Sequence, residues 1–491
     1  AASAAAECDL GIVGAAAGGA YAAWRASAAG LKVCVLERAQ RPGGRIHSLR
    51  GQGPRGDLVV EAGGYRFAPK PVSQSAGWNV STPLTAKIIQ ELGLPTVAYN
   101  PNPSDWDHGL HKIVTPDGQD AGYLTFIERM LGLASARNAT IRYGSPVVSL
   151  RDVSNSAGDI EAVALRLQSG EEVVARSVLL NIPQHPMVEL LRASSGRLAS
   201  LFPKPLYNPV FYPIMKLYLH YDDAWWRNDL GLVHGPFANE EPPAKHSEHV
   251  PNIPVDSPAP LLGQYHDGDV RCDLPEGKCR GFLQTYYGGD SAGRMDFFLP
   301  YVDAELDEPA IQLNRSAAHH SALMDALHAS LVDHHRAALL AAGGEAAVQR
   351  VQALQPSGGI VTIWNQGVAG IHAGCHVAKR SATGSDPVPG ELSKAALKPL
   401  PGWPVYVANE AFGPMTCWAE SSLVMSEAAL RKMGVPTPAW LEESFADGLL
   451  EPEFNRGRAS SDPWLSQSAR FASAWPPFRA APAPTPEGLV V

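Results

Sequence analysis

The residues best suited to chemistry lie near the start of the chain, where small residues separate two apolar runs. Gly14-Ala-Ala-Ala-Gly-Gly19 follows the first run, and Glu37 ends the second. Glycines in this place let the backbone and a helix N-terminus approach a pyrophosphate, and a carboxylate after the next strand accepts hydrogen bonds from ribose hydroxyls. Ala16 replaces the usual middle glycine, yet the order of motif and elements predicts a dinucleotide site.

The apolar runs also predict the elements that position this motif. Residues 9–14 and 32–37 lack polar alternation, which is typical of buried parallel strands, and residues 15–29 between them favour a helix that Gly30 ends. The remaining expected elements are strands at 147–150, 162–167, 177–182, 209–221, 281–287 and 404–408, and helices at 122–133, 316–342 and 420–433.

Two glycine pairs after this β-α-β segment carry a family resemblance. Arg41-Pro-Gly-Gly-Arg45 and Glu61-Ala-Gly-Gly64 resemble the paired-glycine loops of the flavin-containing amine oxidase superfamily, which plain nicotinamide dehydrogenases lack. Glycines there let backbone amides reach the pyrophosphate and the flavin ring, and Arg45 supplies charge to the phosphates. The alternative is a pair of ordinary surface turns with a solvated arginine. The resemblance implies FAD as the cofactor.

Two distant segments extend the resemblance. Residues 143–150 are similar to the family's second flavin segment, in which a valine, here Val147, meets the adenine through its backbone. Residues 405–426 are similar to its C-terminal flavin motif, in which Glu410 would bond the ribityl or phosphate end and a helix near Trp418 would direct its positive end at the flavin. Three residues depart from the usual pattern there: Asn409, Cys417 and Ser421.

Cys375 is loosely similar to the cysteine by which monoamine oxidases bond flavin covalently, although a buried thiol is the favoured alternative.

The resemblance implies cofactor contacts from all of the segments named above. The residues that match the flavin motifs are Val13, Gly14, Ala16, Ala17, Gly18, Gly19, Glu37, Arg38, Gly43, Gly44, Arg45, Gly63, Gly64, Tyr65, Arg66, Val147, Glu410, Trp418, Ala419 and Ser421.

A lysine and an arginine are the expected catalytic residues on the substrate side. Lys216 lies in an apolar run that resembles the superfamily strand whose lysine holds a water beside flavin N5, and its alternative is a side chain that reaches the surface. Arg66 follows the second glycine pair, as in L-amino-acid oxidases, where an arginine clamps the substrate carboxylate with its planar fork. An arginine that bonds backbone or a nearby acid is the alternative.

Three aromatic residues complete the expected substrate-binding set. By resemblance, Tyr286 or Tyr287 would help Arg66 grip the carboxylate, and Trp418 would form a wall beside the amino group. For aromatic residues at strand ends, packing in the core is the alternative.

The resemblance implies an FAD-dependent oxidase that converts L-amino acids to 2-oxo acids with release of ammonia and hydrogen peroxide. A hydride would pass from the α-carbon to flavin N5, water would hydrolyse the imino acid, and dioxygen would reoxidise the flavin. No side-chain base is obligatory for this reaction. Two alternatives stay open: an amine or polyamine oxidase of the same superfamily, for which Arg66 would be incidental, and a non-catalytic flavin-binding protein.

The expected fold class is α/β and α+β, with a Rossmann-type FAD-binding domain and a mixed-sheet substrate domain of the amine oxidase/glutathione reductase-like kind. The FAD-binding domain would be discontinuous, over residues 1–68, 136–205 and 395–435. The substrate-binding domain would comprise residues 69–135 and 206–394. Residues 436–491 would form a Pro-rich C-terminal extension.

Charge and hydropathy limit the partners. A net charge of −9 argues against nucleic acid, because that affinity depends on Lys and Arg side chains that neutralise phosphates. No apolar run is long enough to span a membrane, so we expect a soluble protein whose partners are a small amino acid and dioxygen. The oligomeric state is open, with a homodimer as one alternative.

Cysteines and sequons bear on the compartment. Small residues at 1–6 and sequons at Asn79, Asn138 and Asn314 favour a secreted or periplasmic protein. The six cysteines are too few for a disulfide scaffold; Cys272 and Cys279 could close a short loop, with free buried thiols as the alternative. No metal site is expected, because no residues have a full metal-ligand spacing.

Overall fold

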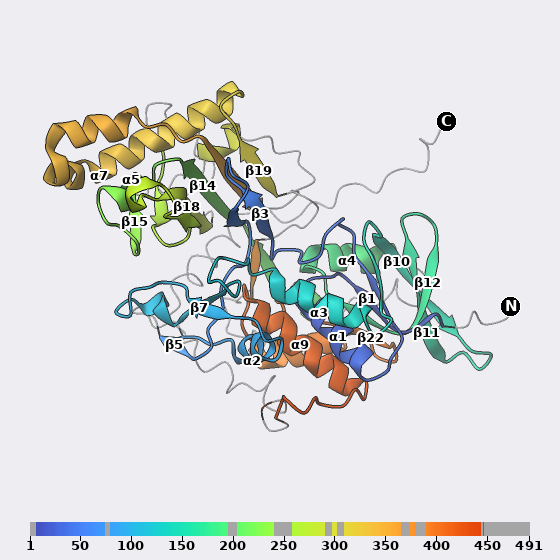
Figure 1. The fold of residues 1–491 in the computed structure, drawn as a ribbon. Helices are drawn as coiled ribbons and strands as arrows, with labels where there is room; N and C mark the ends of the chain where they lie inside the picture. Colours follow the sequence, from blue (N-terminus) through green and yellow to red (C-terminus); the bar gives the residue numbers. More distant parts are fainter. Residues whose placement is uncertain are drawn as a thin grey trace, which may run out of the picture.

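Two lobes, each built on a large β-sheet, make up the molecule (Figure 1). The structure is a computed structural model. It describes residues 6–73, 79–194, 204–239, 258–289, 297–301, 309–364, 374–378, 389–442 and 445.

The first lobe contains a seven-stranded sheet in the order β10-β11-β12-β1-β2-β9, with β22 beside β12. β12–β1, β1–β2, β2–β9 and β12–β22 are parallel pairs, whereas β10, β11 and β12 run antiparallel. The strands β2 and β22 are buried along their whole length, as strands covered on both faces must be. The bounds are β1 Cys8–Val13, β2 Val33–Leu36, β9 Thr140–Arg142, β10 Val147–Ser154, β11 Ile160–Leu167, β12 Glu172–Leu180 and β22 Val405–Val407.

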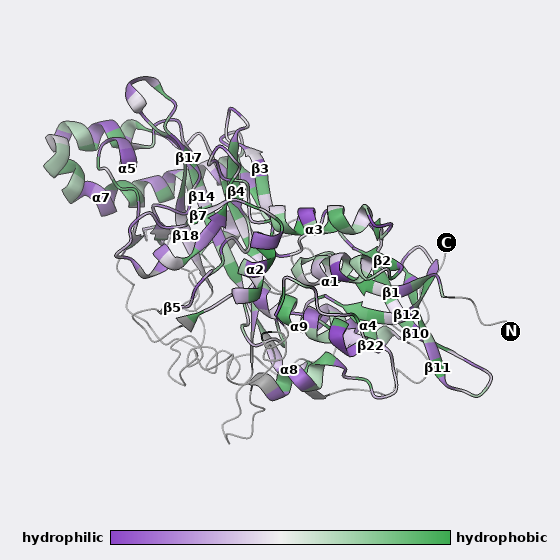
Figure 2. Cartoon of the chain, turned by 60° about the horizontal axis from the view of Figure 1, so that its bottom comes forward, coloured by the Kyte–Doolittle hydropathy of each residue, from purple (hydrophilic) through white to green (hydrophobic). Residues whose placement is uncertain are grey.

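Helices α1 (Ala17–Ala28), α3 (Thr125–Ser135) and α9 (Ala419–Lys432) pack together beside this sheet. A buried ion pair joins α1 to α9: Arg25 Nη2 lies 3.2 Å from Glu427 Oε1, and the hydroxyl of Tyr21 donates to Glu427 Oε2 at 2.8 Å. On the other side, α4 (Gln184–Ala193) packs on β10. Apolar residues concentrate in the strands between these helices (Figure 2).

The second lobe contains an antiparallel sheet in the order β15-β16-β18-β14-β20-β19, with β17 beside β18. The helices α5 (Trp225–Asn228) and α7 (Ala318–Ala353) supply the core that covers it. Gly343 and Gly344 interrupt the helical backbone of α7, so the expected helix 316–342 continues beyond a kink. The bounds are β14 Ile214–Tyr221, β15 Pro236–Ala238, β16 Leu262–Gln264, β17 Val270–Arg271, β18 Arg280–Gly289, β19 Ala310–Leu313 and β20 Gly358–Trp364.

The remaining elements of the described residues are short. They form the pairs β3–β4, β5–β6, β7–β8 and β13–β21, with the helices α2 and α8 and the 3₁₀ turns η1, η3, η4 and η5. Their bounds are β3 Ser48–Gln52, β4 Leu58–Glu61, β5 Val72–Ser73, β6 Asn79–Val80, β7 Thr96–Ala98, β8 His111–Ile113, β13 Pro209–Tyr212, β21 Cys375–Ala378, α2 Pro83–Glu91, α8 Pro389–Leu397, η1 Trp106–Gly109, η3 Lys204–Tyr207, η4 Pro275–Gly277 and η5 Leu299–Tyr301.

The predicted fold class is confirmed: a Rossmann-like lobe is joined to a second sheet domain. Several bounds differ. The expected strand 209–221 divides into β13 and β14 at Pro213, which cannot donate to a strand partner. Residues 69–135 were expected in the substrate-binding domain, but their helices α2 and α3 join the first core, because the apolar faces of both helices pack there. No described helix is both long and apolar enough to cross a membrane.

Of the two alternatives for the cysteines, the short loop between Cys272 and Cys279 is the one that forms, and free buried thiols are excluded because all six cysteines are paired. Cys8 joins Cys34 between β1 and β2, and Cys272 joins Cys279 in the turn between β17 and β18. The third disulfide, Cys375–Cys417, joins β21 to the loop before α9. Only the short-loop pair could be considered from spacing alone, since the others depend on which strands become neighbours.

The buried pair of Arg25 and Glu427 gives a stability prediction. Glu427→Gln leaves the buried Arg25 guanidinium without a counter-charge, so the free energy of unfolding should fall by about 3 kcal/mol. The matched control is Glu128→Gln, which removes a pair with Arg50 that is about 40% exposed on both sides and should cost less than about 1 kcal/mol. Urea denaturation of both variants tests this, and equal losses would contradict it.

Candidate active site

A cavity of about 970 Å³ receives side chains from both lobes. Pockets of this size accommodate cofactors and their substrates. Most residues predicted from the motifs line it, namely Val13, Gly14, Ala16, Ala17, Glu37, Arg38, Gly43, Gly44, Arg45, Gly63, Gly64, Tyr65, Arg66, Val147, Lys216, Tyr287, Glu410, Trp418 and Ala419.

At one end of the cavity, the turn between β1 and α1 is built to receive a phosphate. Ala16 is the N-cap residue of α1 and has no side chain that could cap the helix. Ser422 Oγ accepts from the N–H of Gly18 at 2.9 Å, and Ala17, the first residue of the helix, lines the cavity, where a helix N-terminus favours a phosphate. Glu37 stabilises this turn, since its carboxylate accepts hydrogen bonds from the N–H groups of Ala15 at 2.7 Å and Ala39 at 2.8 Å. Each carboxylate oxygen retains a second lone pair for a ribose hydroxyl.

Four predicted residues do not line the cavity. A Cβ on Gly19 would lie 2.0 Å from the carbonyl oxygen of Gly14, and one on Gly18 would lie 2.3 Å from Ser422 Oγ, so both glycines allow close packing of α1. Ser421 instead accepts a hydrogen bond from the N–H of Met415, and its neighbour Ser422 lines the cavity. Tyr286, the fourth, is fully buried in the second core.

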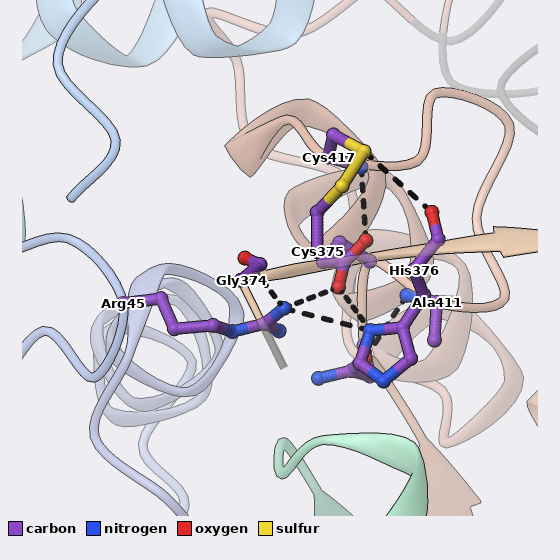
Figure 3. The surroundings of a disulfide bond; sticks show 8 residues. Arg45, Gly374, Cys375, His376, Ala411 and Cys417 are labelled. Carbon is purple, nitrogen blue, oxygen red and sulfur yellow. Dashed lines mark hydrogen bonds and ion pairs between the residues drawn. A yellow bond between two sulfur atoms is a disulfide. The ribbon is translucent and has the colours of Figure 1, made fainter. Parts of the chain in front are cut away.

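Arg45 and Glu410 form an ion pair in the cavity wall (Figure 3). Glu410 Oε1 accepts from Arg45 Nη1 and from His376 Nδ1, both at 2.5 Å, and Oε2 accepts from the N–H of Cys417 at 2.9 Å. Burial alone would raise the pKa of Glu410, but the charge of Arg45, followed by His376, lowers it to about 2. Glu410 therefore stays ionised across the physiological range.

Lys216 binds the second glycine loop rather than reaching the surface. Its Nζ donates to the carbonyl oxygens of Glu61 at 3.0 Å and Gly63 at 2.6 Å, and lies 3.7 Å from the ring centroid of Tyr65. An ammonium has three N–H groups, so one remains for a water or a substrate. Burial lowers the pKa of Lys216, while Asp267 and Glu61 oppose that shift.

Arg66 packs against the same tyrosine as Lys216. Its guanidinium carbon is 4.7 Å from the ring centroid of Tyr65 and 5.5 Å from that of Tyr99, and its side chain lines the cavity. Tyr287 lines the cavity beside it and packs edge-on against Tyr65 at 5.8 Å. Two cations and a group of tyrosines thus form one wall of the site.

A buried acid, Asp267, contacts these tyrosines without lining the cavity itself, and sequence reasoning missed it. Its side chain is fully buried, accepts a hydrogen bond from the hydroxyl of Tyr99, and lies 3.5 Å from that of Tyr65. The charge of Asp267 helps to raise the pKa of Arg66, and it opposes the decrease that burial causes in the pKa of Lys216. No motif surrounds Asp267 in the sequence. Only the turn after β16 brings it to the glycine loop.

The residues that line the cavity fit FAD. A helix N-terminus and Glu37 provide partners for a pyrophosphate and a ribose, and Gly44 and Gly64 present bare backbone to the cavity. Trp418 and Ala419 place the start of α9 in the cavity wall as well, where a helix N-terminus stabilises negative charge. Among the described residues, no cluster of three or more His, Cys, Asp or Glu could hold a metal ion.

Comparisons with known proteins agree with this assignment. Residues 12–75 match the family model of the NAD(P)-binding Rossmann-like domain, and residues 112–298 match that of the flavin containing amine oxidoreductase. A solved putrescine oxidase double mutant with redesigned cofactor binding is similar over 87% of this chain and 99% of its own, with 13% identity and a TM-score of 0.50, a likeness of fold alone. A comparison with curated proteins gives no match.

The match to the flavin containing amine oxidoreductase model and the residues of the cavity agree with each other, and the cofactor that they fit is FAD.

The lowered pKa of Lys216 predicts a pH dependence. If neutral Lys216 takes up the proton that a substrate ammonium must lose, kcat/KM should rise as the pH increases through this pKa, well below the ordinary lysine range. Lys216→Met keeps the aliphatic stem and should remove this limb of the profile. A limb that persists in Lys216→Met would assign it to another group.

Asp267 should influence the pH at which kcat/KM rises. Because its carboxylate raises the pKa of Lys216, Asp267→Asn should move the limb to lower pH by about one unit. Asp273→Asn is the matched control, since Asp273 pairs with Arg55 and Arg280 away from the cavity. The pH profiles of kcat/KM for the two variants are compared, and the same shift in both would contradict the role of Asp267.

Proposed function

We propose that this protein is an FAD-dependent L-amino-acid oxidase. The overall reaction converts an L-amino acid, dioxygen and water to a 2-oxo acid, ammonia and hydrogen peroxide. The main observation behind this proposal is that Arg66 and Lys216 both line the cavity and both contact Tyr65. A substrate with a carboxylate and an amine on neighbouring atoms would place the carboxylate at Arg66 and the amine near Lys216. The family match supports oxidation of an amine, and Arg66 supports an amino acid.

Each residue of this wall has a distinct task in the proposed reaction. Arg66 pairs with the two carboxylate oxygens and thereby fixes the α-carbon. Tyr287 and Trp418 bound the substrate, since both line the cavity. Lys216 Nζ holds the water that hydrolyses the imino acid and exchanges a proton with it. When bound, FAD supplies a two-electron acceptor for the α-hydrogen that dioxygen reoxidises.

An amine or polyamine oxidase is the second candidate, and Asp267 favours it. The buried carboxylate already balances the charge of Arg66, so the site does not need a substrate carboxylate to neutralise that cation. The tyrosine-rich wall would suit an amine that carries no carboxylate. The two candidates differ in what Arg66 contacts, which makes this residue the one to change.

Arg66→Lys and Arg66→Ala test the carboxylate clamp. For an L-amino acid, loss of the paired fork should raise KM by about 100-fold in Arg66→Ala and by less in Arg66→Lys. Arg50→Ala is the matched control, because Arg50 is exposed and pairs with Glu128. Peroxide production is measured with a panel of L-amino acids and a panel of diamines and polyamines.

The panels decide between the candidates. Turnover of polyamines alone, or an unchanged KM for amino acids in Arg66→Ala, would reject the amino-acid oxidase. If no amine bleaches the flavin absorbance without oxygen, the protein is a non-catalytic flavin-binding protein.

We also propose that the protein works in an oxidising compartment, secreted or periplasmic. Three disulfides support this, because such bonds persist mainly outside the reducing cytosol.

A further inference from the structure

The Cys375–Cys417 disulfide is part of the flavin cavity wall. Both cysteines line the cavity, where Cys417 is exposed and Cys375 is only 4% exposed. Figure 3 shows the bond near Arg45 and His376, and the side chains of both residues contact the carboxylate of Glu410. Neither of the other disulfides lines the cavity. Cys417 is therefore the more accessible of the two cysteines to a small thiol reagent in the cavity.

The bond joins two segments that are 42 residues apart in the sequence. Cys375 begins β21, which pairs only with β13 among the described strands. Cys417 immediately precedes Trp418, the N-cap residue of α9. The disulfide thus couples β21 to the helix whose N-terminus faces the cavity.

The backbone of Cys417 adds a second observation. Its φ of +70° lies in the left-handed region, which is unfavourable for residues other than glycine. In this conformation the N–H of Cys417 donates to Glu410, which in turn pairs with Arg45. Without the covalent bond, little in the residue itself favours this conformation. Relaxation of Cys417 would remove one of the hydrogen bonds that orient Glu410 in the wall.

We propose that Cys375 and Cys417 form a thiol–disulfide site that controls retention of FAD. The disulfide form holds the cofactor, and the dithiol form releases it more readily. This inference depends on FAD binding and does not depend on which amine the protein oxidises.

The chemistry is a balanced two-electron exchange. Two molecules of a small thiol reduce the disulfide: the first attacks one sulfur and expels the other as a thiolate, and the second displaces the first as a small disulfide. In the reverse direction, the dithiol and one hydrogen peroxide give the disulfide and two waters. Hydrogen peroxide is a product of the proposed oxidase, so turnover would favour the disulfide form, which retains FAD.

Thermodynamic linkage makes the effect reciprocal. If reduction of the bond weakens FAD binding by a given factor, bound FAD must oppose reduction of the bond by the same factor. A coupling of about tenfold is typical of such linked sites. FAD should therefore protect this disulfide from reductant, whereas Cys272–Cys279, outside the cavity, should react equally with and without FAD.

The test measures flavin retention and thiol content of the full-length holoprotein. The protein is incubated with and without a water-soluble phosphine, and released FAD is measured by its fluorescence in the ultrafiltrate. Differential alkylation and peptide mass spectrometry report which cysteines were reduced. We expect the Kd for FAD to rise by about tenfold when Cys375 and Cys417 are reduced.

Two variant sets separate this bond from the others. The double variant Cys375→Ser/Cys417→Ser should bind FAD about tenfold more weakly than the unmodified protein, whether or not reductant is present. Cys272→Ser/Cys279→Ser should keep tight binding and full sensitivity to the phosphine. Glycine adopts a positive φ without strain, so Cys417→Gly removes the disulfide from a chain that should fold more readily than the double variant. Far-UV circular dichroism confirms that each protein is folded.

Unchanged FAD affinity after proven reduction of the bond would overturn the proposal, as would a folded double variant that binds FAD as tightly as the unmodified protein. Equal reduction of Cys375–Cys417 with and without FAD would overturn the linkage. None of these results depends on turnover, so a failed amino-acid panel leaves this inference standing, and the reverse is also true.

Discussion

The ion pair between Arg45 and Glu410 is the interaction on which the cofactor cavity depends. It joins the first glycine loop to the C-terminal flavin segment, 365 residues further along the chain. The same carboxylate binds His376 on β21 and the N–H of Cys417 before α9, so one buried anion connects three separate segments. Because its pKa is held near 2, the carboxylate keeps its charge, and the connection does not weaken at neutral pH.

A second constraint is the cost of burying charge on the substrate wall. Lys216 is almost fully buried, and its ammonium is stabilised by two backbone carbonyls of the second glycine loop and by the face of Tyr65. The buried carboxylate of Asp267 compensates for Lys216 and Arg66 together. The glycine loop therefore contributes to the cofactor site and also holds the lysine in place.

Much of the Rossmann lobe could be predicted from sequence, because its signals are local. The apolar runs that became β1, β2 and β22 and the glycines that follow them specify a buried parallel sheet and a phosphate turn within a few residues. Asp267, Ser422 and the Cys375–Cys417 bond could not be found in this way, since each depends on the approach of segments far apart in the chain.

For the two tyrosines of β18, the sequence pattern alone does not identify which side chain faces the cavity. Adjacent strand residues face opposite sides of a sheet, so only one of Tyr286 and Tyr287 can reach the cavity. The sequence does not say which face is which. Pairing with β14 decides it: Tyr287 is opposite Lys216 and faces the cavity, whereas Tyr286 is opposite Leu217 and packs in the second core.

The charges of this wall link carboxylate binding to the protonation of Lys216. Arg66 has five N–H donors in a plane, enough to serve a substrate carboxylate while Asp267 remains nearby. A carboxylate that binds to Arg66 adds negative charge to a wall where burial already lowers the pKa of Lys216. That added charge must raise the pKa of Lys216, because an anion stabilises a nearby ammonium. An amino acid would therefore meet a more protonated lysine than an amine without a carboxylate, so the two substrate classes should differ in pH dependence as well as in affinity.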